Sequence, residues 1–141
     1  MTTAYKQILF ACTQNAVRSV IAKGLFEAKS YAPASRAVSC GVIEGPLDGF
    51  AVAVLQEKGI DVSTHQAQAF EALNPADFDV IVSFSREAEA KARRWANEEC
   101  ETLFWHVRPP QTDERSRDTT LESYRQIREQ IDRLLTDYFA G

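Results

Sequence analysis

The chain has 141 residues, of which 45% are hydrophobic and 26% are charged, and its formal net charge at pH 7 is −4. This length is typical of one compact domain, so we expect a single domain over residues 1–141. The acidic balance argues against nucleic acid or an anionic membrane as the main partner. No apolar run approaches the roughly 20 residues of a membrane-spanning helix, which predicts a soluble protein.

The cysteines and the start of the chain predict the compartment. Cys12, Cys40 and Cys100 are odd in number and far apart in the sequence, which does not match a disulfide framework. Residues 1–6 lack the apolar core of a secretory signal, and the apolar run over 8–11 is too short to supply one. We therefore expect a cytoplasmic protein with reduced thiols, where a special cysteine is reactive rather than structural.

The first half of the chain predicts two strands, each followed by a helix. Residues 8–11 form a short apolar run typical of a strand that is buried on both faces. A polar loop over 12–19 comes next, followed by an apolar stripe with helical spacing. Residues 37–40 predict a second strand, and residues 47–58 predict a helix that ends at a glycine. The stripe after the loop consists of Val20, Ile21, Gly24, Leu25 and Phe26.

The second half repeats the alternation of strands and helices. Residues 63–64, a serine and a threonine, predict the cap of a short helix that runs toward Phe70. The clearest strand in the chain covers 79–84, and a charged, alanine-rich helix is expected over 86–97. Residues 102–105 predict a fourth strand.

The last predicted element is a strongly amphipathic helix. Thr119 and Glu122 have the spacing of a capping box at its start. Its apolar residues recur at helical spacing and predict one buried stripe. These residues are Leu121, Tyr124, Ile127, Ile131, Leu134, Leu135 and Tyr138.

This order of elements predicts an α/β fold. We expect a three-layer sandwich in which a four-stranded, mostly parallel sheet is covered by helices on both faces. In such sheets, ligands bind beyond the carboxyl ends of the strands. The loop over 12–19 lies at one such end and directly precedes a helix, so it is the place to look for a function.

The loop has the chemistry of an oxyanion site. A loop of this length can surround a tetrahedral anion with backbone N–H groups, and the following helix adds its positive end. Arg18 offers a planar fork that can hold two oxygens of one phosphate. The same positive surroundings favour the thiolate form of Cys12. Ser19 can donate a hydrogen bond to that sulfur, and Asn15 can brace the loop. The alternative is structural, with Cys12 as a small buried side chain and Arg18 as a solvated residue at a helix start.

The sequence around this loop resembles a known family. The signature of the low-molecular-weight protein tyrosine phosphatases closely resembles the run Ile8-Leu9-Phe10-Ala11-Cys12-Thr13-Gln14-Asn15-Ala16-Val17-Arg18-Ser19. Ser39-Cys40-Gly41 stands where the family usually has Ser-Ala-Gly. Residues 55–67 resemble its helix, Gly-Ile-Asp and Ser-x-His pattern, residues 78–82 its third strand, and residues 124–128 its last helix. Arsenate reductases that are coupled to thioredoxin share the fold and the loop.

The resemblance implies roles for the matching positions. Cys12 matches the nucleophile and Arg18 the arginine that binds phosphate. Ser19 matches the hydroxyl that stabilises the thiolate, and Asn15 and Ser39 match the network that shapes the loop. The backbone amides expected to bind phosphate belong to Thr13, Gln14, Asn15, Ala16, Val17, Arg18 and Ser19.

The general acid of the family is missing from its usual position. The family has an aspartate in an Asp-Pro pair after the fourth strand, and the corresponding residue here is Pro109. A positioned acid typically contributes about 10²–10⁴-fold to the chemical step, so activity is expected to be reduced. Asp113 is a possible substitute, although a solvated loop is the simpler interpretation of Asp113 and Glu114. His106 is expected to be a packing residue.

The other cysteines do not match those of the arsenate reductases. The reductases need further cysteines, one of them near the end of the third strand, and residues 83–85 of this chain contain none. A reversible disulfide between Cys12 and Cys40 can be imagined because both residues end predicted strands, although a buried structural Cys40 is the simpler interpretation. Cys100 lies among glutamates that disfavour a thiolate, and we expect no role for it.

The resemblance implies a cysteine-dependent phosphomonoester hydrolase. A phosphorylated protein, through its phosphotyrosine, or a small phosphomonoester is the expected partner, and inorganic phosphate is the expected product or inhibitor. No metal or organic cofactor is expected, since the two histidines lack partners at ligand spacing. Two alternatives remain open at this point. One is a regulatory module that binds an oxyanion with little or no turnover, and the other is an arsenate reductase. The sequence leaves the oligomeric state open.

Overall fold

Four parallel strands form one central sheet in the computed structural model, which describes residues 7–29 and 35–140. The strands lie in the order β2-β1-β3-β4. Their bounds are Gln7–Cys12 for β1, Arg36–Gly41 for β2, Val80–Ser83 for β3 and Glu101–Phe104 for β4. The predicted four-stranded sheet is confirmed, and each neighbouring pair is parallel. Residues 1–6, where no secretory signal was expected, lie outside the described residues.

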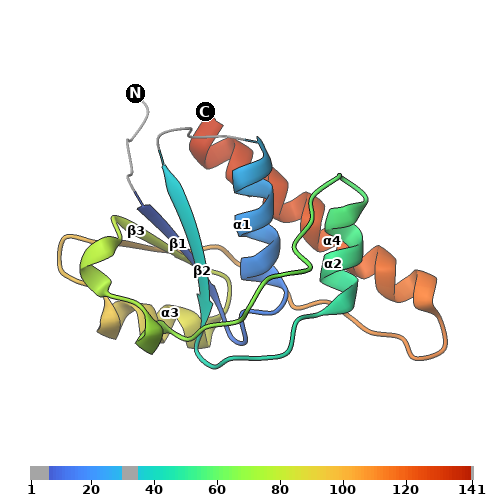
Figure 1. The fold of residues 1–141 in the computed structure, drawn as a ribbon, viewed down its shortest axis with the longest axis horizontal. Coiled ribbons are helices and arrows are strands. Elements are labelled where there is room, and N and C mark those ends of the chain that lie inside the picture. Colours follow the sequence, from blue (N-terminus) through green and yellow to red (C-terminus); the bar gives the residue numbers. More distant parts are fainter. Residues whose placement is uncertain (1–6, 30–34, 141) are drawn as a thin grey trace.

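Helices cover both faces of the sheet (Figure 1). One face carries α1 (Arg18–Lys29), α2 (Gly49–Gln56) and α4 (Arg117–Leu135). The other face carries α3 (Arg86–Trp95). The predicted three-layer sandwich is therefore confirmed. No helix of the described part of the chain has the length and apolar character needed to cross a membrane.

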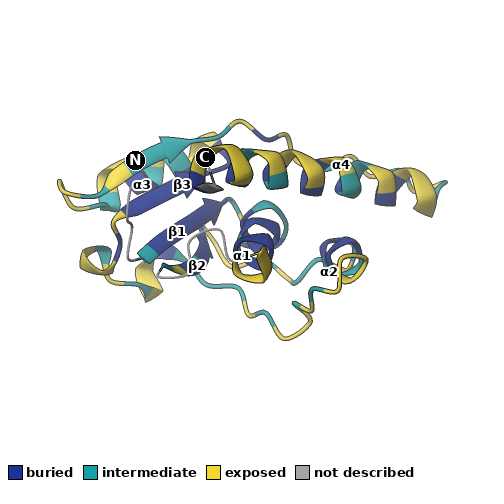
Figure 2. Cartoon of the chain, turned by 90° about the horizontal axis from the view of Figure 1, so that it is seen from above, coloured by how far each residue is buried: buried dark blue, intermediate teal, exposed yellow. Residues whose placement is uncertain are grey.

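The central strand β1 is buried on both faces, as its apolar run predicts. Ile8, Phe10 and Cys12 belong to the core on the side of α1 and α4. Leu9 and Ala11 belong to a second core on the side of α3. Figure 2 shows most of β1 and β3 in the buried colour and the outer side of α4 in the exposed colour. Burying one large apolar side chain contributes about 1.5–3 kcal/mol, so this alternation fixes which side of the sheet each residue of β1 faces.

The short helix predicted after residues 63–64 is wrong. Residues 63–64 form a turn, and the chain then runs extended until Ala69 bridges to Gly41. A single 3-10 turn follows over Phe70–Ala72. The backbone of this segment bonds to β2 instead of to itself, since Gly41 N donates to Gln68 O at 2.8 Å. Pairing with the edge strand takes the place of the local helix.

The N-cap of the last helix lies three residues before its predicted position. Ser116 is the N-cap, and its Oγ accepts a hydrogen bond from Thr119 N at 3.1 Å. The predicted capping box of Thr119 and Glu122 is therefore wrong. Most of the predicted stripe of α4 is buried, although Leu134 is only half-buried, and the turn that follows widens over Thr136–Ala140. As a result Phe139 is buried and Tyr138, which was predicted to be buried, is 38% exposed.

Two polar contacts hold α2 against α4. Tyr124 OH donates to Asp48 Oδ2 at 2.7 Å, and Asp48 Oδ1 also caps α2. At the other end of α2, Glu57 accepts hydrogen bonds from Arg125 and from the buried Arg128. Charge-assisted pairs with two guanidinium groups favour the ionised carboxylate. Hydrogen bonds from Arg125 and then Arg128 lower the pKa of Glu57 from its usual 4.5 to about 2.

The contacts of Glu57 with Arg125 and Arg128 predict a pH-dependent stability. Because the pKa of Glu57 is lower in the folded state, its contribution to the unfolding free energy is present above about pH 4.5 and is lost as the pH falls toward 2. The unfolding free energy of Glu57→Gln should therefore fall less steeply than that of the unsubstituted protein between pH 4.5 and 2. Urea unfolding across this range measures both slopes. Glu27→Gln, which breaks only an exposed pair with Lys23, is the control and should keep the original slope. Equal slopes for the protein and Glu57→Gln would contradict the prediction.

Candidate active site

The loop between β1 and α1 lies at the carboxyl edge of the sheet, where the sequence placed it. β1 ends at Cys12 and α1 begins at Arg18, so the two residues flank a five-residue turn. Cys12 is 3% exposed, and its Sγ lies 2.9 Å from Ser19 Oγ in the first turn of α1. The predicted pairing of Cys12 with the Ser19 hydroxyl is thus present in the structure.

A buried asparagine fixes the shape of the loop. Asn15 has a φ of 56°, a left-handed conformation that asparagine adopts more readily than most residues. Its Nδ2 donates to Ser19 Oγ at 2.9 Å. Because Ser19 Oγ accepts this bond, its own hydrogen is available to the sulfur of Cys12.

Two residues that the sequence analysis missed support this asparagine. Gln68 N donates to Asn15 Oδ1 at 3.0 Å, and His65 Nε2 lies 3.0 Å from Asn15 O. A carbonyl oxygen only accepts, so His65 Nε2 carries the hydrogen. Gln68 Nε2 also donates to Ser39 O at 3.0 Å, so Ser39 joins the network through its carbonyl. The place of His65 in the Ser-x-His pattern of residues 55–67 was the available signal for this contact.

The carbonyl groups of the loop point to the segment after β2. Val42 N donates to Cys12 O at 3.1 Å, Ile43 N to Thr13 O at 3.0 Å and Gly45 N to Gln14 O at 2.8 Å. Within residues 7–29 and 35–140, no acceptor takes a hydrogen bond from the backbone N–H groups of residues 13–17. A run of unpaired N–H groups at a helix start is an anion-binding arrangement.

The close approach of the end of β2 to the loop requires a glycine at position 41. A Cβ added at Gly41 would lie 2.7 Å from Asn15 N and 2.6 Å from Ile43 O. Both neighbours are main-chain atoms, one in the loop and one in the segment after β2, so neither can shift without distorting the backbone. Gly41 therefore allows β2 to lie directly against the loop.

Arg18 connects the loop to the other two strands. Its Nη1 donates to Phe84 O and to Val107 O, each at 2.9 Å. Among the described residues nothing accepts a bond from its Nε or Nη2, which leaves these two nitrogens for two oxygens of an anion. Partial burial lowers the pKa of Arg18, and the charges of Cys12 and Glu87 oppose this shift. Phe84 and Val107 were not predicted to take part, because their contribution is a main-chain carbonyl that no side-chain pattern reveals.

The loop is also tied to the start of α3. Thr13 Oγ1 donates to Ser85 Oγ at 3.0 Å, and the same oxygen caps α3 by accepting from Ala88 N at 3.2 Å. Ala16 is buried, Val17 is half-buried and Gln14 is exposed at the mouth of the loop. Residues 12–19 thus form one continuous loop between β1 and the first turn of α1. No group of His, Cys, Asp or Glu side chains in the described ranges has the arrangement of a metal site.

Comparison with known proteins identifies the family. The model of the low molecular weight phosphotyrosine protein phosphatases matches residues 7–140, which includes the whole sheet and the loop. The chain belongs to this family. The resemblance noted from the sequence is thereby confirmed.

The proteins that are similar to this chain include two kinds of enzyme, arsenate reductases and tyrosine phosphatases. The glutaredoxin arsenate reductase of Synechocystis sp. is 30% identical over 129 residues, which cover 89% of this chain and 90% of that protein. A solved arsenate reductase in its phosphate binding state has a TM-score of 0.79 and 26% identity, over 96% of this chain and 97% of that chain. The low molecular weight protein tyrosine phosphatase of T. tengcongensis has a TM-score of 0.76 and 26% identity, over 92% and 95%.

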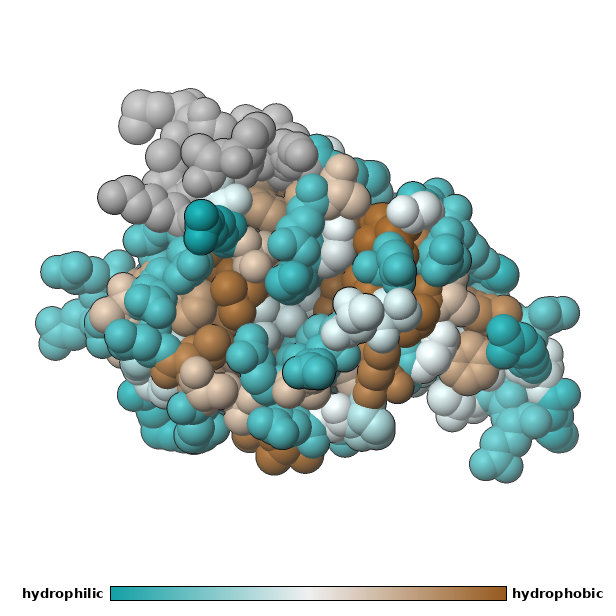
Figure 3. Space-filling view, in the orientation of Figure 1, coloured by the Kyte–Doolittle hydropathy of each residue, from teal (hydrophilic) through white to brown (hydrophobic). Residues whose placement is uncertain are grey.

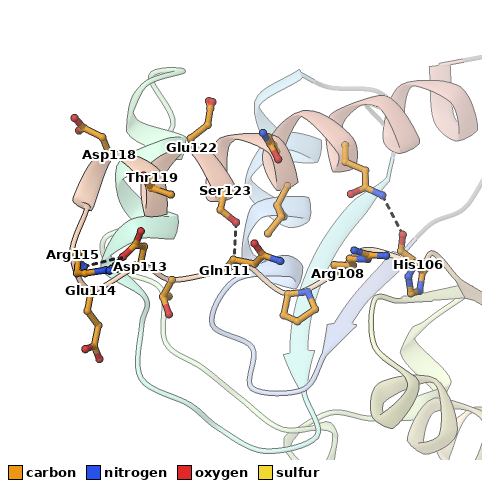
Figure 4. Close-up of a pocket in the computed structure, with 15 residues that line it drawn as sticks. His106, Arg108, Gln111, Asp113, Glu114, Arg115, Asp118, Thr119, Glu122 and Ser123 are labelled. Carbon is orange, nitrogen blue, oxygen red and sulfur yellow. Dashed lines mark hydrogen bonds and ion pairs between the residues drawn. The ribbon is translucent and has the colours of Figure 1, made fainter.

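The segment after β4, where the resemblance places the acid of the family, contacts Arg18 at Val107 and then continues along α4. Residues 106–115 line a groove along α4 in which His106 and Arg108 lie at one end and Asp113 at the other (Figure 4). Asp113 Oδ1 accepts from Arg115 N at 2.9 Å and lies 3.8 Å from Arg115 Nε. Asp113 therefore shapes the turn before α4, and its hydrogen bonds in the described residues go to Arg115, Ser116 and Thr120. Pro109 is exposed.

The remaining cysteines are not placed to exchange disulfides with Cys12. Cys40 pairs in register with Ala11 and lies in the core on the side of α3, whereas Cys12 faces the opposite side of the sheet. Burial raises the pKa of the Cys40 thiol well above its usual range. Cys100 precedes β4, at the opposite end of the strands, and burial followed by the charges of Asp79 and Glu101 raises its pKa to about 11. The imagined disulfide between Cys12 and Cys40 is thus not supported.

The network around Asn15 predicts a loss of stability on substitution. Asn15→Ala removes the bonds to Ser19 and Gln68 and leaves a Cβ residue with a φ of 56°. We expect the unfolding free energy to fall by about 2–4 kcal/mol, from buried polar groups left unpaired and from the left-handed backbone. Asn15→Gly is the matched control, because glycine accepts this φ, and should lose roughly 1 kcal/mol less. Urea unfolding measures both values, and a change under 0.5 kcal/mol for the alanine variant would contradict the account.

Proposed function

We propose that this member of the family is a cysteine-dependent phosphomonoester hydrolase. The observation that carries the proposal is the buried Cys12 Sγ, held by Ser19 beneath a loop with five unpaired N–H groups and beside the open side of Arg18. Sulfur, amides and guanidinium together suit a tetrahedral dianion. No other group of side chains in the described residues offers a comparable nucleophile.

The reaction has two steps. The Cys12 thiolate attacks phosphorus, the bond from phosphorus to the leaving oxygen breaks, and a phosphocysteine remains. Nε and Nη2 of Arg18 and the N–H groups of residues 13–17 stabilise the equatorial oxygens. A water molecule then attacks the phosphocysteine, which releases inorganic phosphate and restores the thiolate. Ser19 stabilises that thiolate as a hydrogen-bond donor.

An aryl phosphate, such as the phosphotyrosine of a protein, is the substrate that we propose. The family is described by its action on phosphotyrosine. Ile43, whose N–H binds the loop, is 54% exposed, and Figure 3 shows an apolar patch at the lower edge of the molecule, over the segment after β2. An apolar wall beside an oxyanion site suits an aromatic ring attached to phosphate. Inorganic phosphate, the product, is expected to inhibit.

Hydrolysis of 4-nitrophenyl phosphate tests the proposal. The protein should turn over this substrate, inorganic phosphate should compete with it, and rapid acid quenching with ³²P-labelled substrate should trap phosphocysteine. The alternative of a binding module without turnover is supported by Pro109. It would be favoured by a phosphate-induced rise in melting temperature together with no hydrolysis above that of a Cys12→Ser control.

Arsenate reduction is a second candidate, and the similarity to the Synechocystis protein favours it. Arsenate has the shape and charge of phosphate and fits the same loop. Cys40 and Cys100 are not placed to resolve an adduct on Cys12, so an external thiol would have to attack the Cys12 sulfur. The bond between sulfur and arsenic then breaks, arsenite leaves as arsenic(III), and a mixed disulfide forms on Cys12, which a second external thiol reduces. The test is arsenite formation from arsenate in the presence of glutathione and glutaredoxin, or of thioredoxin. If arsenite forms in these assays while 4-nitrophenyl phosphate is not hydrolysed, arsenate reduction replaces hydrolysis as the leading proposal.

The setting of the reaction follows from its chemistry. We propose that the chain works as a single domain, because both cores pack on one sheet. Catalysis requires a reduced Cys12, and this supports the cytoplasmic location that the cysteine pattern predicts.

A further inference from the structure

The hydrolysis proposed above requires a proton that no residue has yet supplied. When the bond from phosphorus to the leaving oxygen breaks, an alkoxide or phenoxide leaves poorly unless an acid protonates it. Pro109 has no proton to donate. A different side chain near the open side of the loop is therefore needed.

Most nearby carboxylates are already occupied. Asp48 accepts from Tyr124 OH and from the first amides of α2. Glu89 is paired with Arg86 and Arg93. Each of these carboxylates holds its own element in place, and Asp113 does the same at the start of α4.

Glu87 is free and lies beside the site. Two hydrogen bonds tie the start of α3 to the loop, from Arg18 Nη1 to Phe84 O at 2.9 Å and from Thr13 Oγ1 to Ser85 Oγ at 3.0 Å. Glu87 follows Ser85 by two residues, in the first turn of α3. Glu87 is exposed, and it makes no hydrogen bond or ion pair with any of the described residues.

The charge of Glu87 is felt at the guanidinium. Burial lowers the pKa of Arg18, and the negative charges of Cys12 and Glu87 raise it again. Of the two residues whose charges raise the pKa of Arg18, only Glu87 is a carboxylate. Its carboxylate is therefore within electrostatic reach of the group that binds the anion, on the α3 side of the loop.

We propose that Glu87 is the catalytic acid and base of this site. As the Cys12 sulfur bonds to phosphorus, the carboxylic acid form of Glu87 gives its proton to the leaving oxygen, which departs as an alcohol or phenol. The resulting Glu87 carboxylate then takes a proton from the water whose oxygen attacks the phosphocysteine. The bond between sulfur and phosphorus breaks, the thiolate returns, and Glu87 is again protonated.

Glu44 provides a matched control on the opposite wall of the loop. It lies between Ile43 and Gly45, whose N–H groups bind loop carbonyls, and it is exposed like Glu87. Glu44→Gln therefore removes one negative charge near the mouth without removing the proposed proton donor.

The experiment compares kcat/KM for aryl phosphates whose leaving groups range from 4-nitrophenol to phenol. Protonation matters little for a good leaving group and greatly for a poor one. Glu87→Gln should lower kcat/KM only a few-fold for 4-nitrophenyl phosphate and about 10²-fold or more for phenyl phosphate. Glu44→Gln should keep the leaving-group dependence of the unsubstituted protein. An unchanged inhibition constant for phosphate would show that the loop of Glu87→Gln is intact.

Two results would overturn the assignment of Glu87 while leaving the hydrolysis in place. One is an equal loss for all substrates, which indicates a general structural effect. The other is an equal gain for all substrates, which indicates that Glu87 only repels the anion. If the unsubstituted protein hydrolyses none of the substrates above the Cys12→Ser background, the proposed function itself fails and the assignment fails with it.

Discussion

Changing Cys12 to serine is expected to abolish hydrolysis of 4-nitrophenyl phosphate, with a loss in kcat on the order of 10⁴-fold or more. A serine hydroxyl is not ionised near neutral pH, and the hydrogen-bond partner that the described residues offer at position 12 is the hydroxyl of Ser19, which is not a base. Ser19, the hydrogen-bond partner of the sulfur, offers a donor and thus stabilises an anion. The side chain changes little in size, so the loop should keep its shape.

Retained binding separates lost chemistry from lost structure in this variant. The N–H groups of residues 13–17 and the free nitrogens of Arg18 are untouched, so inorganic phosphate should still raise the melting temperature of Cys12→Ser. Cys100→Ser is the control, since this thiol lies at the other end of the sheet and its pKa is raised to about 11. Its kcat should stay within about twofold of the original. Residual activity of Cys12→Ser above roughly 1% would exclude Cys12 as the nucleophile.

Changing Arg18 to lysine is expected to lower kcat/KM by about 10²–10³-fold, the usual cost of removing one preorganised donor to a developing oxyanion. Lysine keeps the charge but has one nitrogen, which cannot bind Phe84 O and Val107 O and also grip two phosphate oxygens. Two main-chain carbonyls then lose their donor. Phosphate inhibition should weaken in parallel with the loss of kcat/KM.

The matched control for this change is Arg108→Lys. Arg108 is exposed in the segment after β4, one residue beyond the Val107 carbonyl that Arg18 binds. The same chemical change there should alter kcat/KM less than about threefold. Comparable losses in the two variants, measured by steady-state hydrolysis and phosphate inhibition, would show that general positive charge, and not the fork of Arg18, holds the substrate.

The strands and the loop were predictable because their signals are local. An apolar run over 8–11 that ends in a polar loop before a helical stripe describes β1, the loop and α1 without any distant contact. The sequence predicted the pairing of Cys12 with Ser19 for the same reason, since the two residues are seven apart and joined by one turn. Register and face then followed from the period of two in a strand.

The two errors have different causes. Ser63 and Thr64 suit a helix start, but the following segment pairs with Gly41 at the edge of the sheet, so a tertiary contact outweighs local propensity. The capping box at Thr119 has the correct spacing, yet Ser116 accepts from the backbone N–H of Thr119 and starts α4 earlier. Here one local cap replaces another.

By itself, the sequence determined the family, the three-layer fold and the loop that joins Cys12 to Arg18. Only the tertiary structure decided what closes around that loop. His65, Phe84 and Val107 reach Asn15 or Arg18 across 50, 66 and 89 residues. Phe84 and Val107 contribute main-chain carbonyls, which carry no signal in the sequence. Their positions depend on the strand order β2-β1-β3-β4, which brings the ends of distant strands to one edge of the sheet.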